Sequence, residues 1–135
     1  MFSGVVLKSI VFLSNNRKKA LLEQFCLAYK HILSKYHLFA TYTTSCVVKS
    51  LGLAVTPLLS AKVGGVRQVI SGISSHQFDL VLFFRDNCFV KPDFSGKLCL
   101  ENEIFYACDA HSVPYATNIL MAEVLLRALD SGEFF

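Results

Sequence analysis

The chain has 135 residues and a net charge of +3, with 53% apolar and 17% charged residues. This length fits one domain, since domains typically span about 100–200 residues, and we expect a single domain over residues 1–135. The apolar fraction excludes a disordered segment, and a mild charge with no basic run longer than residues 17–19 argues against nucleic acid as a partner.

The mean hydropathy of +0.48 is high. Even so, no stretch approaches the ~18 apolar residues that a membrane-spanning helix needs. The apolar run at residues 5–13 is interrupted by Lys8 and Ser9, and its basic cluster follows it, which is the wrong order for a signal peptide. We therefore expect a cytoplasmic protein without a membrane partner. The five cysteines form no CxxC pair, which favours reduced thiols and no metal site.

Short apolar runs rich in β-branched and aromatic residues alternate with amphipathic stretches. These runs predict strands at residues 9–13, 38–40, 55–59, 78–84 and 113–117. The fourth run is apolar almost throughout except for Asp79, as expected of a strand buried on both faces. Pro57 predicts that the third strand is weak or lies at an edge.

The stretches between the strands carry apolar residues at helical spacing. They predict helices at residues 17–34, 43–51, 64–76, 99–111 and 119–129. Gly52 stands where the second helix needs a C-terminal cap, and residues 85–98 are expected to form a long loop. Strands that alternate with helices predict an α/β fold with a mostly parallel sheet of about five strands.

In such sheets, ligands bind in the crevice beyond the carboxyl ends of the strands. The segments that follow the predicted strands are therefore the candidates for a site. These segments are residues 14–18, 41–44, 60–67 and 85–93.

Three threonines, Thr41, Thr43 and Thr44, lie between a strand and the start of a helix. Unpaired N–H groups and the macrodipole make a helix N-terminus a ready anion site. A plain N-cap explains one threonine, whereas three hydroxyls favour an oxyanion ligand. Lys18 starts the first helix and could reach the same crevice, although a solvated surface lysine is an equal alternative.

Residues 60–66 form a strand-to-helix loop that contains Ser60, Gly64 and Gly65. A Gly-Gly pair permits a positive φ and a close approach of the backbone to a ligand. An ordinary glycine turn is the alternative explanation.

These stretches resemble the methylglyoxal synthase family. Residues 38–45 resemble the ATGTTG segment of the family, with Tyr42 in place of a glycine. Residues 59–69 resemble its LSGPxGGDQQV segment, and residues 78–86 resemble its IDxxIFFRD strand. Residues 108–118 are also similar, so that the resemblance covers most of the chain in the right order.

The resemblance implies a single Rossmann-like, three-layer domain that assembles into a homohexamer. The family converts dihydroxyacetone phosphate through an enediolate to methylglyoxal and phosphate, without a metal or an organic cofactor. The expected ligand is therefore phosphate or a phosphorylated small molecule. The candidate phosphate-binding residues are Lys18, Thr41, Thr43, Thr44, Ser60, Gly64 and Gly65.

The catalytic positions that the resemblance implies are largely replaced. The aspartate that serves the family as general base is Val66 here, and losing a positioned base typically costs about 10²–10⁴-fold in rate. A histidine and an aspartate after the first strand are Ser14 and Asn15. Asp86 is retained, and Asp93 lies in the loop that carries a second histidine in the family.

Three hypotheses follow. The first is a catalytically impaired member of the family that binds phosphate or a phosphorylated metabolite. The second is an active methylglyoxal synthase with a rearranged site that uses Asp86 and Asp93 as its carboxylates. The third is a structural subunit of an oligomer with an empty phosphate site.

Overall fold

The computed structural model describes residues 8–85 and 100–132. Five strands form one sheet in the order β3-β2-β1-β4-β5, and every neighbouring pair is parallel. The strands are β1 (Ser9–Ser14), β2 (His37–Ala40), β3 (Thr56–Pro57), β4 (Leu80–Phe84) and β5 (Tyr115–Ala116). The predicted parallel α/β fold is confirmed, and the short β3 lies at an edge as its proline predicts.

The helices follow the predicted order. They are η1 (Asn16–Lys18), α1 (Lys19–Ala28), α2 (Lys30–Leu33), α3 (Tyr42–Ser50), η2 (Ala61–Val63), α4 (Gly65–Ser74), α5 (Leu100–His111) and α6 (Ile119–Ser131). The helix predicted over residues 17–34 is interrupted at Tyr29, whose φ of −113° and ψ of 20° leave the helical region. The buried ring of Tyr29 packs on Phe25 at 5.1 Å between centroids, so the apolar spacing runs on through the break. Gly52, at φ +88°, follows α3 as predicted.

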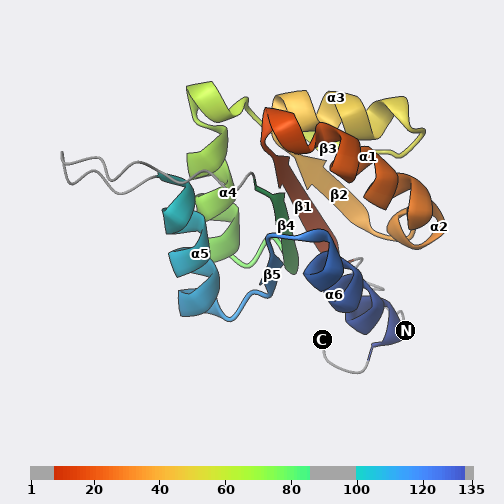
Figure 1. Ribbon diagram of the computed structural model, residues 1–135. Helices are drawn as coiled ribbons and strands as arrows, with labels where there is room; N and C mark the ends of the chain where they lie inside the picture. The colour runs from red at the N-terminus through yellow and green to blue at the C-terminus, as the bar shows by residue number, and fades with distance from the viewer. Residues whose placement is uncertain (1–7, 86–99, 133–135) are drawn as a thin grey trace, which may run out of the picture.

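The sheet lies between two layers of helices. Helices α4 and α5 cover one face, and α1, α2, α3 and α6 cover the other (Figure 1). Alternate residues of β1 serve the two faces: Ile10 and Phe12 pack with the larger group of helices, and Val11 and Leu13 pack with α4 and α5. All five residues of β4 are buried, which explains the unbroken apolar run. None of the helices in the described ranges is long and apolar enough to cross a membrane.

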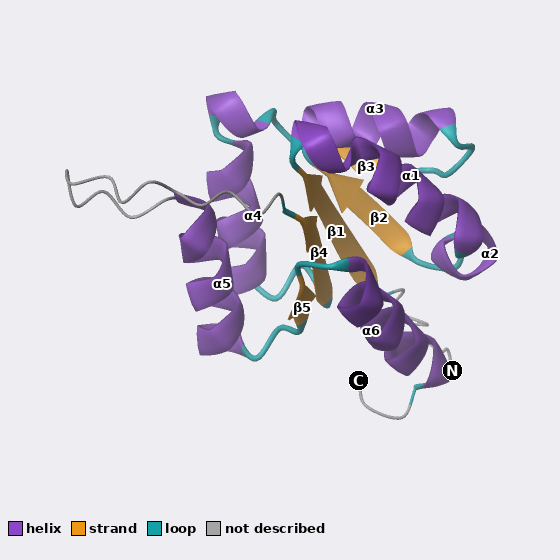
Figure 2. Ribbon diagram, viewed as in Figure 1, coloured by secondary structure: helices purple, strands orange, loops and turns teal. Residues whose placement is uncertain are grey.

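The strand order reverses between β1 and β4, because β2 and β3 lie on one side and β5 on the other. Ligands of open α/β sheets bind at such a reversal, beyond the carboxyl ends of the strands. Figure 2 shows these ends at the top of the view, near the starts of α3 and α4. The N–H of Asn15 donates to the carbonyl oxygen of Phe84 at 3.1 Å, which joins β1 and β4 at this edge.

Three cysteines of the described chain are free. Cys26 and Cys108 are buried, and burial raises the pKa of each thiol to about 12, with Asp109 adding to the shift at Cys108. Cys46 is exposed. The two buried thiols therefore act as small apolar side chains, as the sequence predicts.

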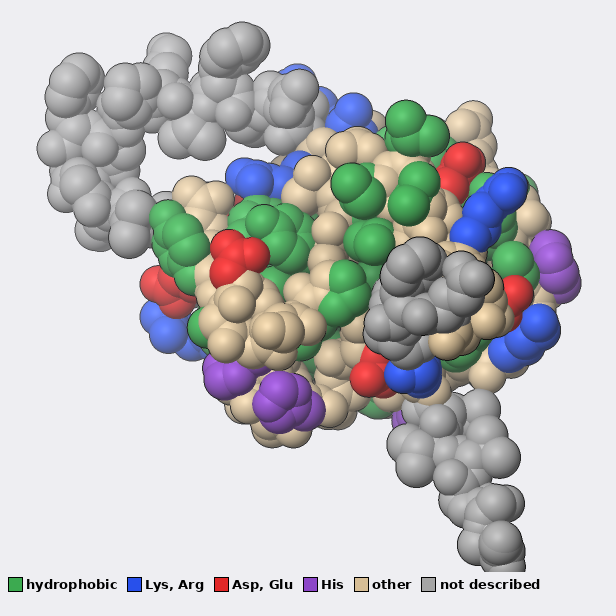
Figure 3. Space-filling model, turned by 90° about the horizontal axis from the view of Figure 1, so that it is seen from below, with side chains coloured by type: hydrophobic (Ala, Val, Ile, Leu, Met, Phe, Trp, Pro, Cys, Tyr) green, Lys and Arg blue, Asp and Glu red, His purple; other side chains and the backbone are tan. Residues whose placement is uncertain are grey.

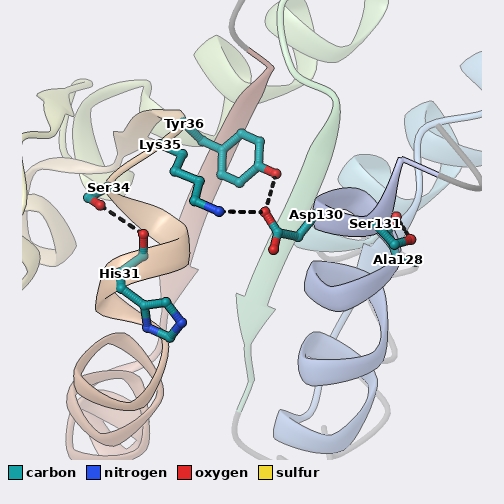
Figure 4. Close-up of polar contacts among 7 residues, drawn as sticks. All are labelled: His31, Ser34, Lys35, Tyr36, Ala128, Asp130 and Ser131. Atoms are coloured by element: carbon teal, nitrogen blue, oxygen red, sulfur yellow. Dashed lines mark hydrogen bonds and ion pairs between the residues drawn. The ribbon is translucent and has the colours of Figure 1, made fainter.

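A polar contact ties α6 to the segment between α2 and β2 (Figure 4). The Tyr36 hydroxyl donates to Asp130 Oδ1 at 3.0 Å, and Lys35 Nζ lies 3.4 Å from the same oxygen. Partial burial and the neighbouring carboxylate together raise the pKa of Tyr36 to about 12.

The titration of Tyr36 tests this contact. Its folded-state pKa of about 12 exceeds the value of about 10 expected in the unfolded chain, so the protonated phenol stabilises the fold below pH 10. That contribution should disappear as the pH rises toward 12. Absorbance of the phenolate, compared between the native chain and Tyr36→Phe, isolates this titration. Asp130→Asn should lower the pKa, and a Tyr36 that titrates near 10 in the native chain would contradict the contact.

Candidate functional site

A cavity of about 480 Å³ lies at the carboxyl edge of the sheet. Segments that follow β1, β2 and β3 converge on it, together with the first turn of α5. Its lining residues are Ser14, Asn15, Asn16, Thr43, Ser60, Ala61, Lys62 and Glu101. Three of the four segments that the sequence analysis singles out thus share one cavity.

The start of α3 presents backbone N–H groups to this edge. Thr41 is the N-cap residue, yet among the described residues no side-chain hydrogen bond caps the helix. The Thr41 hydroxyl instead donates to Thr44 Oγ1 at 3.3 Å, and Ser14 Oγ lies 3.3 Å from the same atom. Thr41 and Thr44 are buried, whereas Thr43 is exposed and lines the cavity. The first-turn amides of α3 are therefore left without the usual side-chain acceptor.

The two glycines shape the loop after β3. The Ser60 carbonyl oxygen accepts from the N–H groups of Val63, at 3.0 Å, and Gly65, at 2.9 Å. Gly64 has a φ of +106°, and a Cβ at Gly65 would lie 2.2 Å from the carbonyl oxygen of Leu59. Both positions thus require glycine for the turn itself. Because the Gly65 amide is already bonded, it is not free to donate to a ligand.

The predicted site residues fall into separate groups. Thr43 and Ser60 line the cavity, while Lys18 is partly buried at the end of η1 and is not among the lining residues. Asp86 and Asp93 lie outside the described residues.

Four polar residues that line the cavity were not selected from the sequence as binding residues: Asn15, Asn16, Lys62 and Glu101. The asparagines and Lys62 belong to segments that follow strands. The expectation that ligands bind beyond the carboxyl ends of strands therefore located these segments, but it did not identify these residues. No sequence signal selected Glu101, because the spacing does not fix how the helix that carries it meets the sheet.

The position at which the resemblance implies the family's base is apolar and closed. Val66 is the second residue of α4 and only 5% exposed. It belongs to the buried cluster that includes Val11, Leu13 and Leu58. A valine in this environment neither holds nor accepts a proton, so the proton-transfer group cannot stand there.

A second cavity, of about 510 Å³, lies beside the edge strand β5. Its lining includes Met121, Leu125 and Tyr115, and Asp109 is the one charged side chain among its described lining residues. Burial raises the pKa of Tyr115, and Asp109 adds to the shift. An anion would meet a carboxylate and apolar walls here, so the polar cavity at the carboxyl edge is the better candidate for a phosphate.

No group of three or more metal-ligating side chains occurs within residues 8–85 and 100–132. None of the four histidines lines the cavity at the carboxyl edge. The rings of His76 and His111 meet edge to face at 5.6 Å between centroids, and the ring of His37 lies 4.5 Å from that of Phe39. Histidine does not supply the chemistry of this cavity.

The fold and the cavity define an open-sheet α/β protein with a polar cavity at the carboxyl edge of its sheet. The chain is 40% identical over 126 residues to the methylglyoxal synthase of Caldicellulosiruptor saccharolyticus, covering 93% of this chain and 86% of that one. It is 38% identical over 124 residues to the methylglyoxal synthase of Listeria welshimeri, with coverages of 91% and 90%.

The crystal structure of methylglyoxal synthase from Elizabethkingia anophelis matches the fold with a TM-score of 0.77 at 27% identity. The match covers 89% of this chain and 77% of that one. A scan against models of protein families finds no match. On the strength of the relatives, this chain belongs to the methylglyoxal synthase family, as the sequence motifs predict.

Proposed function

We propose that the chain binds phosphate or a phosphorylated small metabolite in the cavity at the carboxyl edge of the sheet. The observation that supports this best is the set of donors around one cavity. Its lining residues, beside the start of α3, include two with hydroxyls, two with amides and one with an ammonium group: Thr43, Ser60, Asn15, Asn16 and Lys62.

These groups suit a phosphate for physical reasons. An ammonium group binds a phosphate as a compact point charge, and the unpaired N–H groups of a helix start add donors and a favourable dipole. Thr43, Ser60 and Lys62 are proposed to contact the phosphate directly. Thr41 and Thr44 position the first turn of α3 through their hydroxyl contact. In this proposal Lys18 adds positive charge from η1, while Gly64 and Gly65 shape the loop.

The proposed chemistry is weaker than that of the relatives. The relatives are named methylglyoxal synthases. In this chain a valine, Val66, stands where the resemblance implies the general base of the family. Loss of a positioned base reduces a rate by about 10²–10⁴-fold, so we propose a catalytically impaired member of the family that needs no cofactor. An active methylglyoxal synthase with a rearranged site is the second candidate, because an acidic residue, Glu101, is among the residues that line the cavity. Asp86 and Asp93 remain proposals from the sequence for the same role.

We propose a cytoplasmic homohexamer, as the family resemblance implies. Exposed apolar side chains of α6 support a subunit interface: Leu120 is 69%, Met121 45% and Val124 55% exposed. Hydrophobic side chains also occupy part of the face at the amino ends of the strands (Figure 3). Within the described residues β5 is an edge strand, and the outer side of an edge strand can pair with a strand of a neighbour.

Binding of inorganic phosphate tests the proposed function. Phosphate should raise the melting temperature of the native chain in a saturable way, because it binds only the folded state. Lys62→Ala should weaken binding by roughly 10- to 100-fold, since a hydrogen bond to a charged group contributes about 1.5–3 kcal/mol. Lys49→Ala is the matched control, because Lys49 is an exposed lysine in the last turn of α3 and does not line the cavity. A melting temperature indifferent to phosphate would leave the structural-subunit hypothesis standing.

A further inference from the structure

Glu101 is an acidic residue in a cavity whose other polar lining residues can donate hydrogen bonds to an anion. It is the one carboxylate among the described residues that line the cavity, and it is partly buried in the first turn of α5. No hydrogen bond or ion pair of this carboxylate is found within the described parts of the chain. A negative charge at this place repels a bound phosphate, so an acidic residue here needs a physical explanation.

A purely structural role, stabilising the start of α5, does not require Glu101, because Glu103 can fill the same role. Acidic residues in the first turn of a helix stabilise it through the macrodipole, and α5 has two, Glu101 and Glu103. Both are partly buried, but only Glu101 lines the cavity. The dipole therefore accounts for an acidic first turn but not for the place of Glu101 among the residues that line the cavity.

The two walls of the cavity come from different layers. Thr43 belongs to α3, on one face of the sheet, and Glu101 belongs to α5, on the other. Ser60 and Lys62 come from the loop that leads into α4. A phosphate held at the start of α3 leaves the remaining volume, within about 480 Å³, for the carbon end of a small metabolite.

Resting on phosphate binding and on the second candidate function, an active synthase with a rearranged site, we propose that Glu101 is the general base of this site and replaces the carboxylate missing at Val66. The carboxylate takes a proton from the hydroxyl-bearing carbon of dihydroxyacetone phosphate. The electron pair of that C–H bond forms the carbon–carbon double bond of an enediolate, and the carbonyl electron pair moves to its oxygen. Lys62 lies in the same cavity and offers a positive charge to this oxygen.

Expulsion of phosphate completes the reaction. The terminal hydroxyl becomes a carbonyl as its proton passes to the departing phosphate, and the double bond shifts toward the carbon that bears the phosphate. That C–O bond breaks, and its electron pair leaves with the phosphate. The resulting enolate of methylglyoxal takes back at its terminal carbon the proton held by Glu101. The sequence is redox-neutral and regenerates the carboxylate.

The test compares Glu101→Gln with Glu103→Gln, which removes the other carboxylate of the same helical turn. Dihydroxyacetone phosphate in heavy water is the probe, and hydrogen exchange at its carbon reports deprotonation separately from methylglyoxal formation. Glu101→Gln should reduce both rates by about 10²–10⁴-fold, while Glu103→Gln should leave them unchanged. Binding of inorganic phosphate should persist in Glu101→Gln and become tighter, because a negative charge is removed.

A second variant separates catalysis from structure. Glu101→Asp keeps the carboxylate but moves it back by the length of one methylene group, so it should lower the exchange rate. Because a carboxylate base is still present, the rate should still decline at acidic pH. Glu101→Gln should lack that decline. The proposal is overturned if the native chain binds phosphate but catalyses no exchange, or if Glu101→Gln and Glu103→Gln behave alike. Failure of the native chain to bind phosphate would instead refute the proposed function on which the inference rests.

Discussion

Gly65→Ala is expected to abolish phosphate binding and to lower the free energy of unfolding by about 3 kcal/mol, the upper end of what overpacking usually costs. The added Cβ would lie 2.2 Å from the carbonyl oxygen of Leu59 and 2.8 Å from that of Ser60. Backbone atoms cannot move aside as a flexible side chain does, so the loop itself must shift. Such a shift breaks the bond from the Gly65 N–H to Ser60 and moves Ser60 and Lys62 away from the cavity.

Thermal unfolding with and without phosphate measures both effects. A loss of about 3 kcal/mol corresponds to a fall of roughly 10 °C in a chain of this length. Gly132→Ala is the control, because it places a methyl group at φ +72° with nothing within 4 Å of it. That control should cost only the strain of a left-handed residue, about 1–2 kcal/mol, and should keep phosphate binding. Normal phosphate affinity in Gly65→Ala would show that the loop does not form the site.

The fold follows from patterns that are local in the sequence. β4 appears as an unbroken apolar run because helices bury both of its faces, and the proline at β3 marks an edge because it cannot donate to a ladder. The interruption at Tyr29 was not predictable from spacing. Its ring continues the buried stripe of α1, so the periodicity is the same with or without the break.

The sequence predicted where on the sheet the site lies, but only some of the side chains that line it. Parallel strands bring the segments that follow them to one edge, which located the residues around Thr43 and Ser60. The sequence selected Lys18 as a candidate, whereas Lys62, in η2, is the lysine among the described residues that line the cavity. Glu101 depends on how α5 packs against the sheet, which no local pattern encodes.

Val66→Asp introduces the aspartate that the resemblance implies at this position and is expected to destabilise this chain by about 3 kcal/mol at neutral pH. The side chain is 5% exposed and packs among apolar neighbours from β1 and from the segment after β3. Burial without a partner disfavours the charged form and raises the pKa of such a carboxyl, and the dipole of α4 offsets only about 0.3–1 kcal/mol of this cost.

The pH dependence distinguishes charge from mere polarity in this variant. A carboxyl whose pKa is raised in the folded state stabilises the fold only while it is protonated, so Val66→Asp should be more stable at pH 5 than at pH 8, by roughly 1–2 kcal/mol. Val66→Asn is the matched control, because it is polar and similar in size but does not titrate, and its deficit relative to the native chain should not change with pH. Urea unfolding at the two pH values measures the difference. A Val66→Asp variant as stable as the native chain at pH 8, with faster conversion of dihydroxyacetone phosphate, would show that position 66 reaches the cavity and that Val66 alone blocks the family chemistry.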